Sequence, residues 1–215
     1  MRIVPPDMGN GREGIFVVWL FTGLIFWSFF TNTVNNAIGE MLDAGPILQK
    51  IYFPAYAPVL GVEMAVGVQS LIELGILLLI LLVLVNVSWT WLLLPIVLVF
   101  VVVFVGSIAT IFAVLNIFYR DVAHLVAIAL QLLFYATPII YPITMVTQSW
   151  RGINLRMIIE ANPLASYVGL MRSLLYDLEP GSLFQWGIAG AAALVALGLA
   201  TWLMRTKGAR LGEYV

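Results

Sequence analysis

Five long apolar stretches divide this chain of 215 residues, and together they exclude a water-soluble fold. They run over Gly14 to Phe30, Val59 to Val85, Trp91 to Leu115, Val122 to Ile140 and Phe184 to Met204. A helix needs about 20 apolar residues to cross the hydrocarbon core of a bilayer. Because 62% of the residues are hydrophobic and only 10% are charged, an ordinary polar surface is unattainable. The sequence predicts a single domain over residues 1–215, an all-α integral membrane protein with five transmembrane helices.

The residues that are missing exclude several kinds of chemistry. There is no cysteine, so disulfides, thiolate metal sites and cysteine nucleophiles are excluded. A net charge of -1 argues against nucleic-acid binding. The phosphate-binding pattern GxxxxGK[ST] does not occur, so the chain is not expected to hydrolyse ATP. We therefore expect a non-catalytic membrane protein without a cofactor or metal of its own.

The basic residues Arg205, Lys207 and Arg210 follow the last apolar stretch and indicate a cytoplasmic C-terminus. Five spans would then leave Met1 outside the cell, although the mixed-charge start does not look like a cleaved signal peptide. We expect that a first helix precedes this sequence in the natural protein. A true protein of five helices is the alternative.

The connection from Thr31 to Pro58 shows a helical pattern. Val34, Ile38 and Met41 recur at helical spacing, and Gly45-Pro46 supplies a stop. This pattern predicts a separate amphipathic helix of about three turns on the cytoplasmic side. Such a helix either lies in the lipid interface or docks against a cytoplasmic partner.

Two acids lie in the second apolar stretch. An acid within hydrocarbon is costly, so it normally faces a protein interior or an aqueous cavity. Glu63 is near the inner end and is compatible with the interface, whereas Glu73 is deeper. We therefore expect Glu73 to face the bundle interior, held by neighbouring polar groups or lining a translocation route.

The turn between the third and fourth apolar stretches carries Arg120-Asp121. Asp121 is suited to the N-cap or first turn of the helix that begins at Val122. Arg120 is then free to contact a phosphate, a lipid headgroup or an acid of another chain. The alternative is a positively charged membrane anchor.

The fourth stretch predicts a broken helix. From Val122 to Thr137 is about 24 Å of helix, which is shorter than the hydrocarbon core. Pro138 disfavours helical geometry at Thr137, and Pro142 would clash with the carbonyl group of residue 138 in a continuing helix. Broken backbone at membrane depth must be buried in protein or line a cavity.

Aromatic side chains flank this predicted break. Tyr135 and Tyr141 could stack on sugar rings, although tyrosines also form ordinary belts at the membrane interface. Further along, Asn162-Pro163 begins an amphipathic pattern in which Arg172 and Asp177 are polar. We expect a helix that rests at the outer membrane interface beside the break.

Five motifs occur in one order along the chain: GLIFWSFF, KIYFP, FYRD, TPIIYP and ANPLASYVGLMRSLLY. On these motifs the chain resembles the membrane permease subunits of type-2 ABC exporters. It is most similar to permeases that export lipid-linked polysaccharides such as O-antigen, teichoic acid or cell-wall galactan. That family has six transmembrane helices, the first of which has no counterpart in this sequence.

The resemblance implies a multi-pass protein of the bacterial inner membrane. It implies a homodimer with a second copy of the permease and two cytoplasmic ABC ATPase subunits, which carry ATP and magnesium. A lipid-linked glycan would be the substrate. The candidates for ATPase coupling are Val34, Ile38, Glu40, Met41, Lys50, Phe53, Pro54, Arg120 and Asp121. The candidates for translocation or exit are Glu73, Tyr135, Thr137, Pro138, Tyr141, Pro142, Asn162 and Arg172.

Other functions remain open on the sequence alone. A drug or small-lipid exporter of the same architecture is the main alternative. An intramembrane serine enzyme is a poor fit, because Ser107 lies near mid-span and the only histidine, His124, lies near the inner end. A secondary transporter would depend on an ion gradient instead of ATP.

Overall fold

The computed structural model describes residues 7–11, 13–45, 54, 56–145 and 159–208, and within these ranges the chain is helical without a strand. The longer helices are α1 (Phe16–Asp43), α3 (Ala57–Val83), α4 (Leu94–Phe118), α5 (Val122–Ala136), α7 (Pro163–Arg172) and α8 (Leu183–Lys207). Short 3-10 segments are η1 (Trp89–Leu93) and η2 (Ile143–Met145). A five-residue π-helix, η3 (Ser173–Asp177), continues α7.

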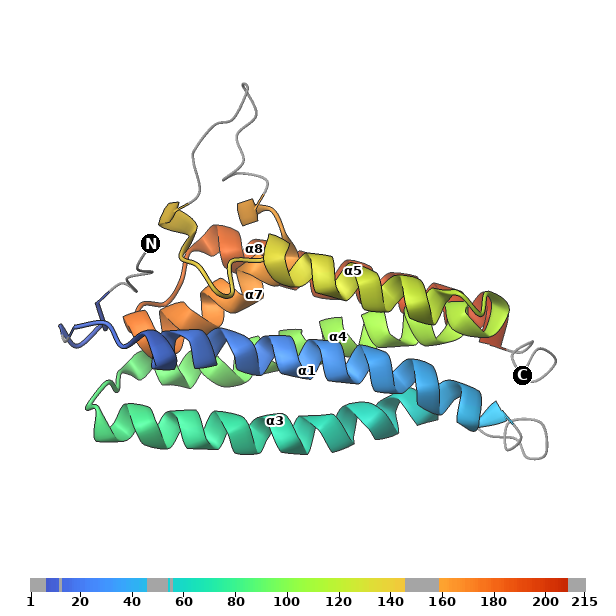
Figure 1. The fold of residues 1–215 in the computed structure, drawn as a ribbon, viewed down its shortest axis with the longest axis horizontal. Helices are drawn as coiled ribbons and strands as arrows, with labels where there is room; N and C mark the ends of the chain where they lie inside the picture. The colour runs from blue at the N-terminus through green and yellow to red at the C-terminus, as the bar shows by residue number, and fades with distance from the viewer. Residues whose placement is uncertain (1–6, 12, 46–53, 55, 146–158, 209–215) are drawn as a thin grey trace, which may run out of the picture.

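The long helices lie side by side along the longest axis of the molecule (Figure 1). α1 packs along both α3 and α4, while α4 also packs along α8. The short helix α7 lies at the end of the bundle where α1 begins and α5 stops, and it contacts α1 and α8 (Figure 1). We call this end the α7 end. The opposite end carries Asp43, Phe118 and Lys207.

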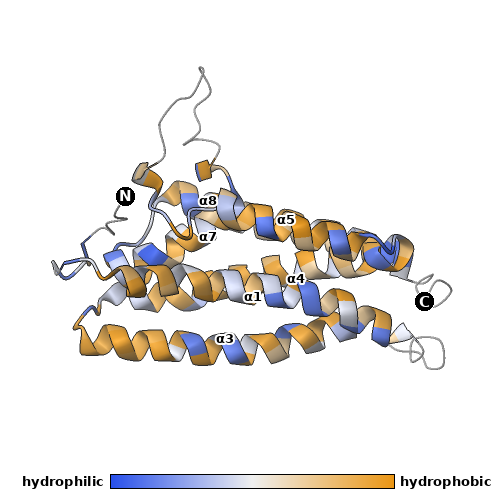
Figure 2. Cartoon of the chain, viewed as in Figure 1, coloured by the Kyte–Doolittle hydropathy of each residue, from blue (hydrophilic) through white to orange (hydrophobic). Residues whose placement is uncertain are grey.

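Length and composition identify four helical segments that can cross a membrane. They are Phe16–Asp43, Ala57–Val83, Trp89–Phe118 and Leu183–Lys207. α5 is equally apolar but has only 15 residues. Hydrophobic residues make up most of these helices (Figure 2). Many of them point outward, as do Met64 and Leu79 of α3, which are 74% and 64% exposed. The expected all-α membrane fold is confirmed.

The prediction that the first helix ends near Phe30 is wrong. α1 continues to Asp43 as one helix of 28 residues, so the predicted amphipathic segment from Val34 onward is the last part of α1 and not a separate helix. No proline lies between Phe30 and Pro46, so only the drop in hydropathy suggested an end. Val34, Ile38 and Met41 are buried, because their face of α1 packs inside the bundle.

The prediction for α7 is right about its start and wrong about its surroundings. The Asn162 side chain caps the helix by accepting a hydrogen bond from the Leu164 amide at 3.0 Å. The helix does not lie on the surface of the bundle, since eight of its ten residues are buried. Tyr167 donates its hydroxyl to the Ala189 carbonyl at 2.8 Å, and its ring packs against Phe26 and Phe104. α7 is therefore part of the core.

Candidate functional site

The predicted break in α5 is confirmed. The helix ends at Ala136, and Thr137 takes an extended conformation with φ -94 and ψ 136. The Thr137 carbonyl then accepts a hydrogen bond from the Ile139 amide at 2.7 Å, which reverses the chain around Pro138. Thr137, Pro138 and Pro142 are all buried. The broken backbone is thus enclosed by protein, which is the environment that non-helical backbone needs inside a membrane.

Arg172 at the end of α7 supports this break. Its Nη1 donates to the Pro138 carbonyl and its Nη2 to the Ile139 carbonyl, both at 2.6 Å. Its guanidinium carbon lies 3.5 Å from the centroid of the Trp19 ring on α1. The side chain is 7% exposed, so the expectation of a polar residue on an outer surface is wrong for Arg172. The two bonds satisfy carbonyl groups that the helix break leaves without helical partners.

The two tyrosines that flank the break lie together. The Tyr141 hydroxyl donates to the Tyr135 carbonyl at 3.1 Å, which ties the chain after the break to the last turn of α5. The Tyr135 ring remains 64% exposed. The structure therefore gathers the predicted exit residues of α5, the following loop and Arg172 into one region. Asn162 acts on α7 as its cap, and Glu73 lies elsewhere, on α3.

The expected roles of the two acids on α3 are reversed. Glu63 is 7% exposed and its carboxyl packs against the backbone of Gly106 on α4. Glu73 is only half-buried, and its Oε1 accepts a hydrogen bond from the exposed Gln69 amide at 3.2 Å. The position of each acid in the sequence predicts how far along α3 it lies, but not which face of the helix it occupies. Glu73 therefore does not line the bundle interior.

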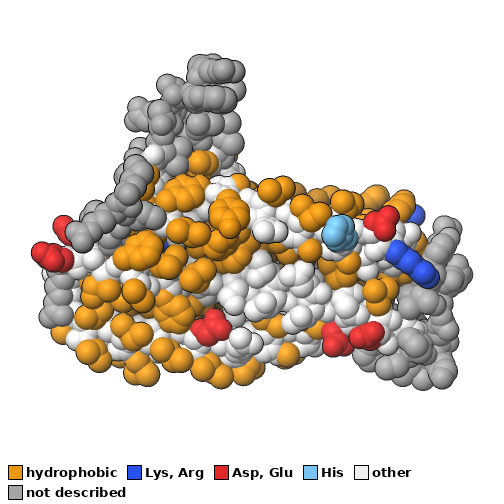
Figure 3. All heavy atoms as spheres, in the orientation of Figure 1, with side chains coloured by type: hydrophobic (Ala, Val, Ile, Leu, Met, Phe, Trp, Pro, Cys, Tyr) orange, Lys and Arg blue, Asp and Glu red, His pale blue; other side chains and the backbone are white. Residues whose placement is uncertain are grey.

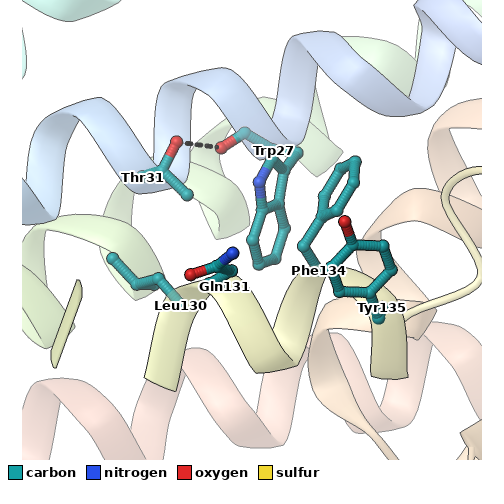
Figure 4. Close-up of a pocket in the computed structure, with 6 residues that line it drawn as sticks. All are labelled: Trp27, Thr31, Leu130, Gln131, Phe134 and Tyr135. Atoms are coloured by element: carbon teal, nitrogen blue, oxygen red, sulfur yellow. Dashed lines mark hydrogen bonds between the residues drawn. The ribbon is translucent and has the colours of Figure 1, made fainter. Parts of the chain in front are cut away.

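A groove of about 270 Å³ runs between α1 and α5. Its walls are Trp27 and Thr31 of α1 together with Leu130, Gln131, Phe134 and Tyr135 of α5 (Figure 4). The rings of Trp27 and Phe134 lie 5.5 Å apart and meet at 50°, so aromatic faces form much of the groove. The Gln131 amide projects between the helices toward Trp27 (Figure 4).

A strip of small polar side chains on α1 adjoins this groove. Ser28, Thr31, Asn32 and Asn35 recur every three or four residues and share one face of the helix. Asn32 donates to the Ser28 hydroxyl at 3.2 Å, and Thr31 donates to the Trp27 carbonyl at 2.9 Å. In the space-filling view, a pale area between α1 and α5 interrupts the hydrophobic surface (Figure 3).

The sequence interpretation missed this polar strip. The signal was the helical spacing of hydroxyl and amide side chains where the first apolar stretch was thought to stop. The groove residues Trp27, Thr31 and Gln131 were missed for a related reason. Their neighbours across the groove come from another helix, so no local pattern joins them.

The opposite end of the bundle carries the candidates for coupling. Three of them, Glu40, Arg120 and Asp121, are exposed at this end. Three others, Val34, Ile38 and Met41, are buried and cannot contact a partner at the surface. Pro54 is exposed, and its carbonyl accepts from the Ala57 amide at 2.9 Å. Lys50 and Phe53 lie outside the described residues.

Asp121 occupies the N-cap position of α5, as predicted, but its side chain makes no capping hydrogen bond. Its backbone is helical, with φ -79 and ψ -9, whereas a side-chain cap normally requires an extended residue. Instead Asn116 of α4 accepts a hydrogen bond from the Ala123 amide at 2.9 Å. The cap of α5 is therefore supplied by the preceding helix.

The chain is similar to permeases of O-antigen export. Two proteins of Klebsiella pneumoniae described as "O-antigen export system permease protein RfbA" are 31% and 32% identical over 163 residues, which is 74% of this chain and 60% of each relative. A protein of Myxococcus xanthus with the same description is 30% identical over 164 residues, 75% of this chain and 62% of the relative. The matched part thus spans about 60% of the length of these curated relatives. No protein-family model matches the chain.

Proposed function

Because the chain is a homologue of the O-antigen export permeases over 74 to 75% of its length, we propose that it is the transmembrane subunit of an ATP-driven ABC exporter. Its substrate is a lipid-linked polysaccharide or cell-wall glycan precursor, which it moves across the cytoplasmic membrane of a bacterium. The relatives are described as permeases of an export system, which supports a transport role over a catalytic one. ATP and magnesium bind to a separate ATPase subunit.

The groove between α1 and α5 is the observation that carries this proposal. Polar side chains on a membrane-facing surface are costly, and they normally face protein or water. The strip formed by Ser28, Thr31, Asn32 and Asn35, together with Gln131 across the groove, offers hydroxyl and amide groups. These groups can exchange hydrogen bonds with the hydroxyls of a glycan. The exposed ring of Tyr135 and the neighbouring Phe134 provide apolar faces for the sugar rings.

A second copy of the chain completes this route. α5 buries only Val126 and Leu130 within its own chain, and it exposes Leu125, Ile128 and Leu132 beside the groove. A homodimer that packs these faces together would enclose the polar strip and separate the glycan from lipid. The groove is open along one side in the single chain, which supports this arrangement.

The two ends of the bundle have different roles in this proposal. The α7 end, with the α5 break, faces outward and forms the exit, whereas the opposite end faces the cytoplasm. Arg205 and Lys207 lie in the last turn of α8 at that opposite end, and their charge supports the orientation. Two ATPase subunits dock there, close to the exposed Glu40, Arg120 and Asp121.

The decisive experiment is purification of the permease together with its ATPase, followed by mass spectrometry of the bound lipid and an export assay in proteoliposomes. We expect a polyprenyl-linked glycan and ATP-dependent export of it, and no ATP turnover by the permease alone. A bound small amphiphile without a glycan would instead point to a drug or small-lipid exporter. ATP turnover by the pure permease would contradict the division of labour between subunits.

The groove itself can be tested with a matched pair of substitutions. Thr31→Val removes a hydroxyl from the groove, and Thr201→Val removes one from the exposed surface of α8. Each hydroxyl donates to the carbonyl four residues earlier in its own helix, at 2.9 Å and 2.8 Å. We expect slower export for Thr31→Val alone. Equal effects of the two changes would place the glycan outside the groove.

A further inference from the structure

The guanidinium of Arg172 occupies a space that three different elements shape. α7 supplies the arginine itself, and α1 supplies Trp19 beneath it and Gly23 beside it. The loop after α5 supplies the two carbonyl groups that accept its hydrogen bonds. One side chain thus connects three segments that are remote in sequence.

Gly23 leaves room for the bonded position of this guanidinium. A Cβ atom at residue 23 would lie 2.8 Å from Nη2 of Arg172 and 3.4 Å from its Cζ. The glycine therefore allows Nη2 to reach the Ile139 carbonyl, and any larger residue would force the arginine aside. The guanidinium is planar and holds its N–H donors in a fixed fork, so it can donate to two neighbouring carbonyls at once.

The same loop defines one end of the groove. Thr137, Pro138 and Ile139 begin two residues after Tyr135, which lines the groove on α5 together with Phe134. Trp19 and Gly23 lie one to two turns before Trp27, which lines it on α1. Arg172 therefore spans the gap between α1 and α5 immediately beyond the groove, at the α7 end.

We propose that Arg172 is a positioning residue for export: its two hydrogen bonds to Pro138 and Ile139 latch the broken end of α5 against α1 and α7, and their release opens the α7 end of the groove. The role in export rests on the proposed function, whereas the latch is a property of the chain alone. Arg172 acts through the backbone of the loop, so its contribution is to the spacing of α1 and α5 at this end.

Two substitutions test the latch in different ways. Arg172→Lys keeps the positive charge but loses the bidentate fork, and Gly23→Ala keeps the arginine but displaces Nη2. A hydrogen bond from a charged group is strong enough that each lost bond should lower the ratio of latched to released chains by about tenfold. Gly187→Ala is the control, because a Cβ atom there meets nothing within 4 Å.

The first readout is the distance between spin labels on α1 and α5. The chain contains no cysteine, so cysteines introduced at Val17 and Leu132, which are 72% and 66% exposed, would be labelled uniquely. In permease–ATPase complexes in lipid that carry the label pair on only one of the two permease copies, we expect one narrow distance distribution for the parent and for Gly187→Ala. A second, longer distance should appear for Arg172→Lys and Gly23→Ala.

The second readout is the amount of glycan exported per ATP hydrolysed in proteoliposomes. We expect this ratio to fall for both latch variants while ATP hydrolysis continues, which a general loss of folded protein would not produce.

Unchanged distances in both variants would overturn the latch. If Arg172→Lys fails to fold, Gly23→Ala decides the question alone. The spin-label distances could change as expected in the two variants while the parent complex exports no glycan. That result would reject the proposed function and leave the latch standing.

Discussion

The carboxyl group of Glu63 on α3 rests against the backbone of Gly106 on α4. Glu63 is 7% exposed, and its Oε1 has no hydrogen-bond partner among the described residues. A Cβ atom on residue 106 would overlap the carboxyl group, so this contact between the two helices depends on a glycine. The carboxyl group of Glu63 is therefore packed tightly between α3 and α4.

We expect Gly106→Ala to destabilise the protein by about 1 to 3 kcal/mol, the usual cost of overpacking in a filled interior. The melting temperature of the protein in detergent would measure this. Gly61→Ala on α3 is the control, because nothing lies within 4 Å of its added Cβ. Adding Glu63→Ala to Gly106→Ala should recover part of the loss. A melting temperature equal to that of the control would contradict the close contact.

Asn86 stabilises the π-helix η3. Its Nδ2 donates to the carbonyls of Leu175 and Tyr176 at 2.9 Å and 3.0 Å, and the side chain is fully buried. Asn86→Ala would leave these buried carbonyls without that donor, at a cost of about 1 to 3 kcal/mol. We expect a lower melting temperature and faster hydrogen exchange over residues 173–177. Asn36→Ala, at an exposed site on α1, should leave both measurements unchanged.

Asn162 fixes the start of α7. Replacing an N-cap asparagine by alanine typically costs about 0.5 to 2 kcal/mol, because an amide of the first turn loses its acceptor. We expect Asn162→Ala to lower the melting temperature and Asn162→Asp to preserve it, since Asp accepts the same bond. Ser182→Ala at the capped start of α8 gives a comparison of similar chemistry. A melting temperature of Asn162→Ala equal to that of the parent would show that the cap is dispensable.

Asp177 makes stability depend on pH. Burial, followed by the nearby Glu179, raises its pKa from 3.8 to about 6, and Arg172 partly opposes this. The folded protein therefore binds this proton more tightly than the unfolded chain. The resulting stabilisation is fully present below about pH 3.8 and is lost as the pH rises through about 6. We expect Asp177→Asn to gain melting temperature over the parent between pH 4 and 7. Parallel pH profiles for the two proteins would refute this assignment.

Local rules were enough to predict some features of the fold. The break at Thr137 follows from the sterics of Pro138, which act on the preceding residue in any fold. The start of α7 follows from Asn162-Pro163, because the cap and the first helical residue are specified by neighbouring positions. These features depend on a few adjacent residues, and the structure confirms them.

Features that depend on contacts between helices were not predictable in this way. Arg172 finds its carbonyl partners 33 and 34 residues earlier in the chain, so its pattern on α7 looked merely amphipathic. Glu63 and Glu73 differ in the face of α3 that each occupies, and hydropathy does not report which face is covered. The end of α1 was misplaced because polar residues such as Asn32 and Asn35 lower hydropathy without stopping a helix.

Because α1 is a single uninterrupted helix, a tilt at one end moves the other end. Its 28 residues give a rod about 42 Å long, without a proline at which it could bend. A tilt of about ten degrees about the end at Asp43 would move the end at Phe16 by roughly 7 Å, given that length. Because Trp19 and Gly23 both belong to this rod, torque applied at one end reaches the guanidinium of Arg172 without an intervening hinge.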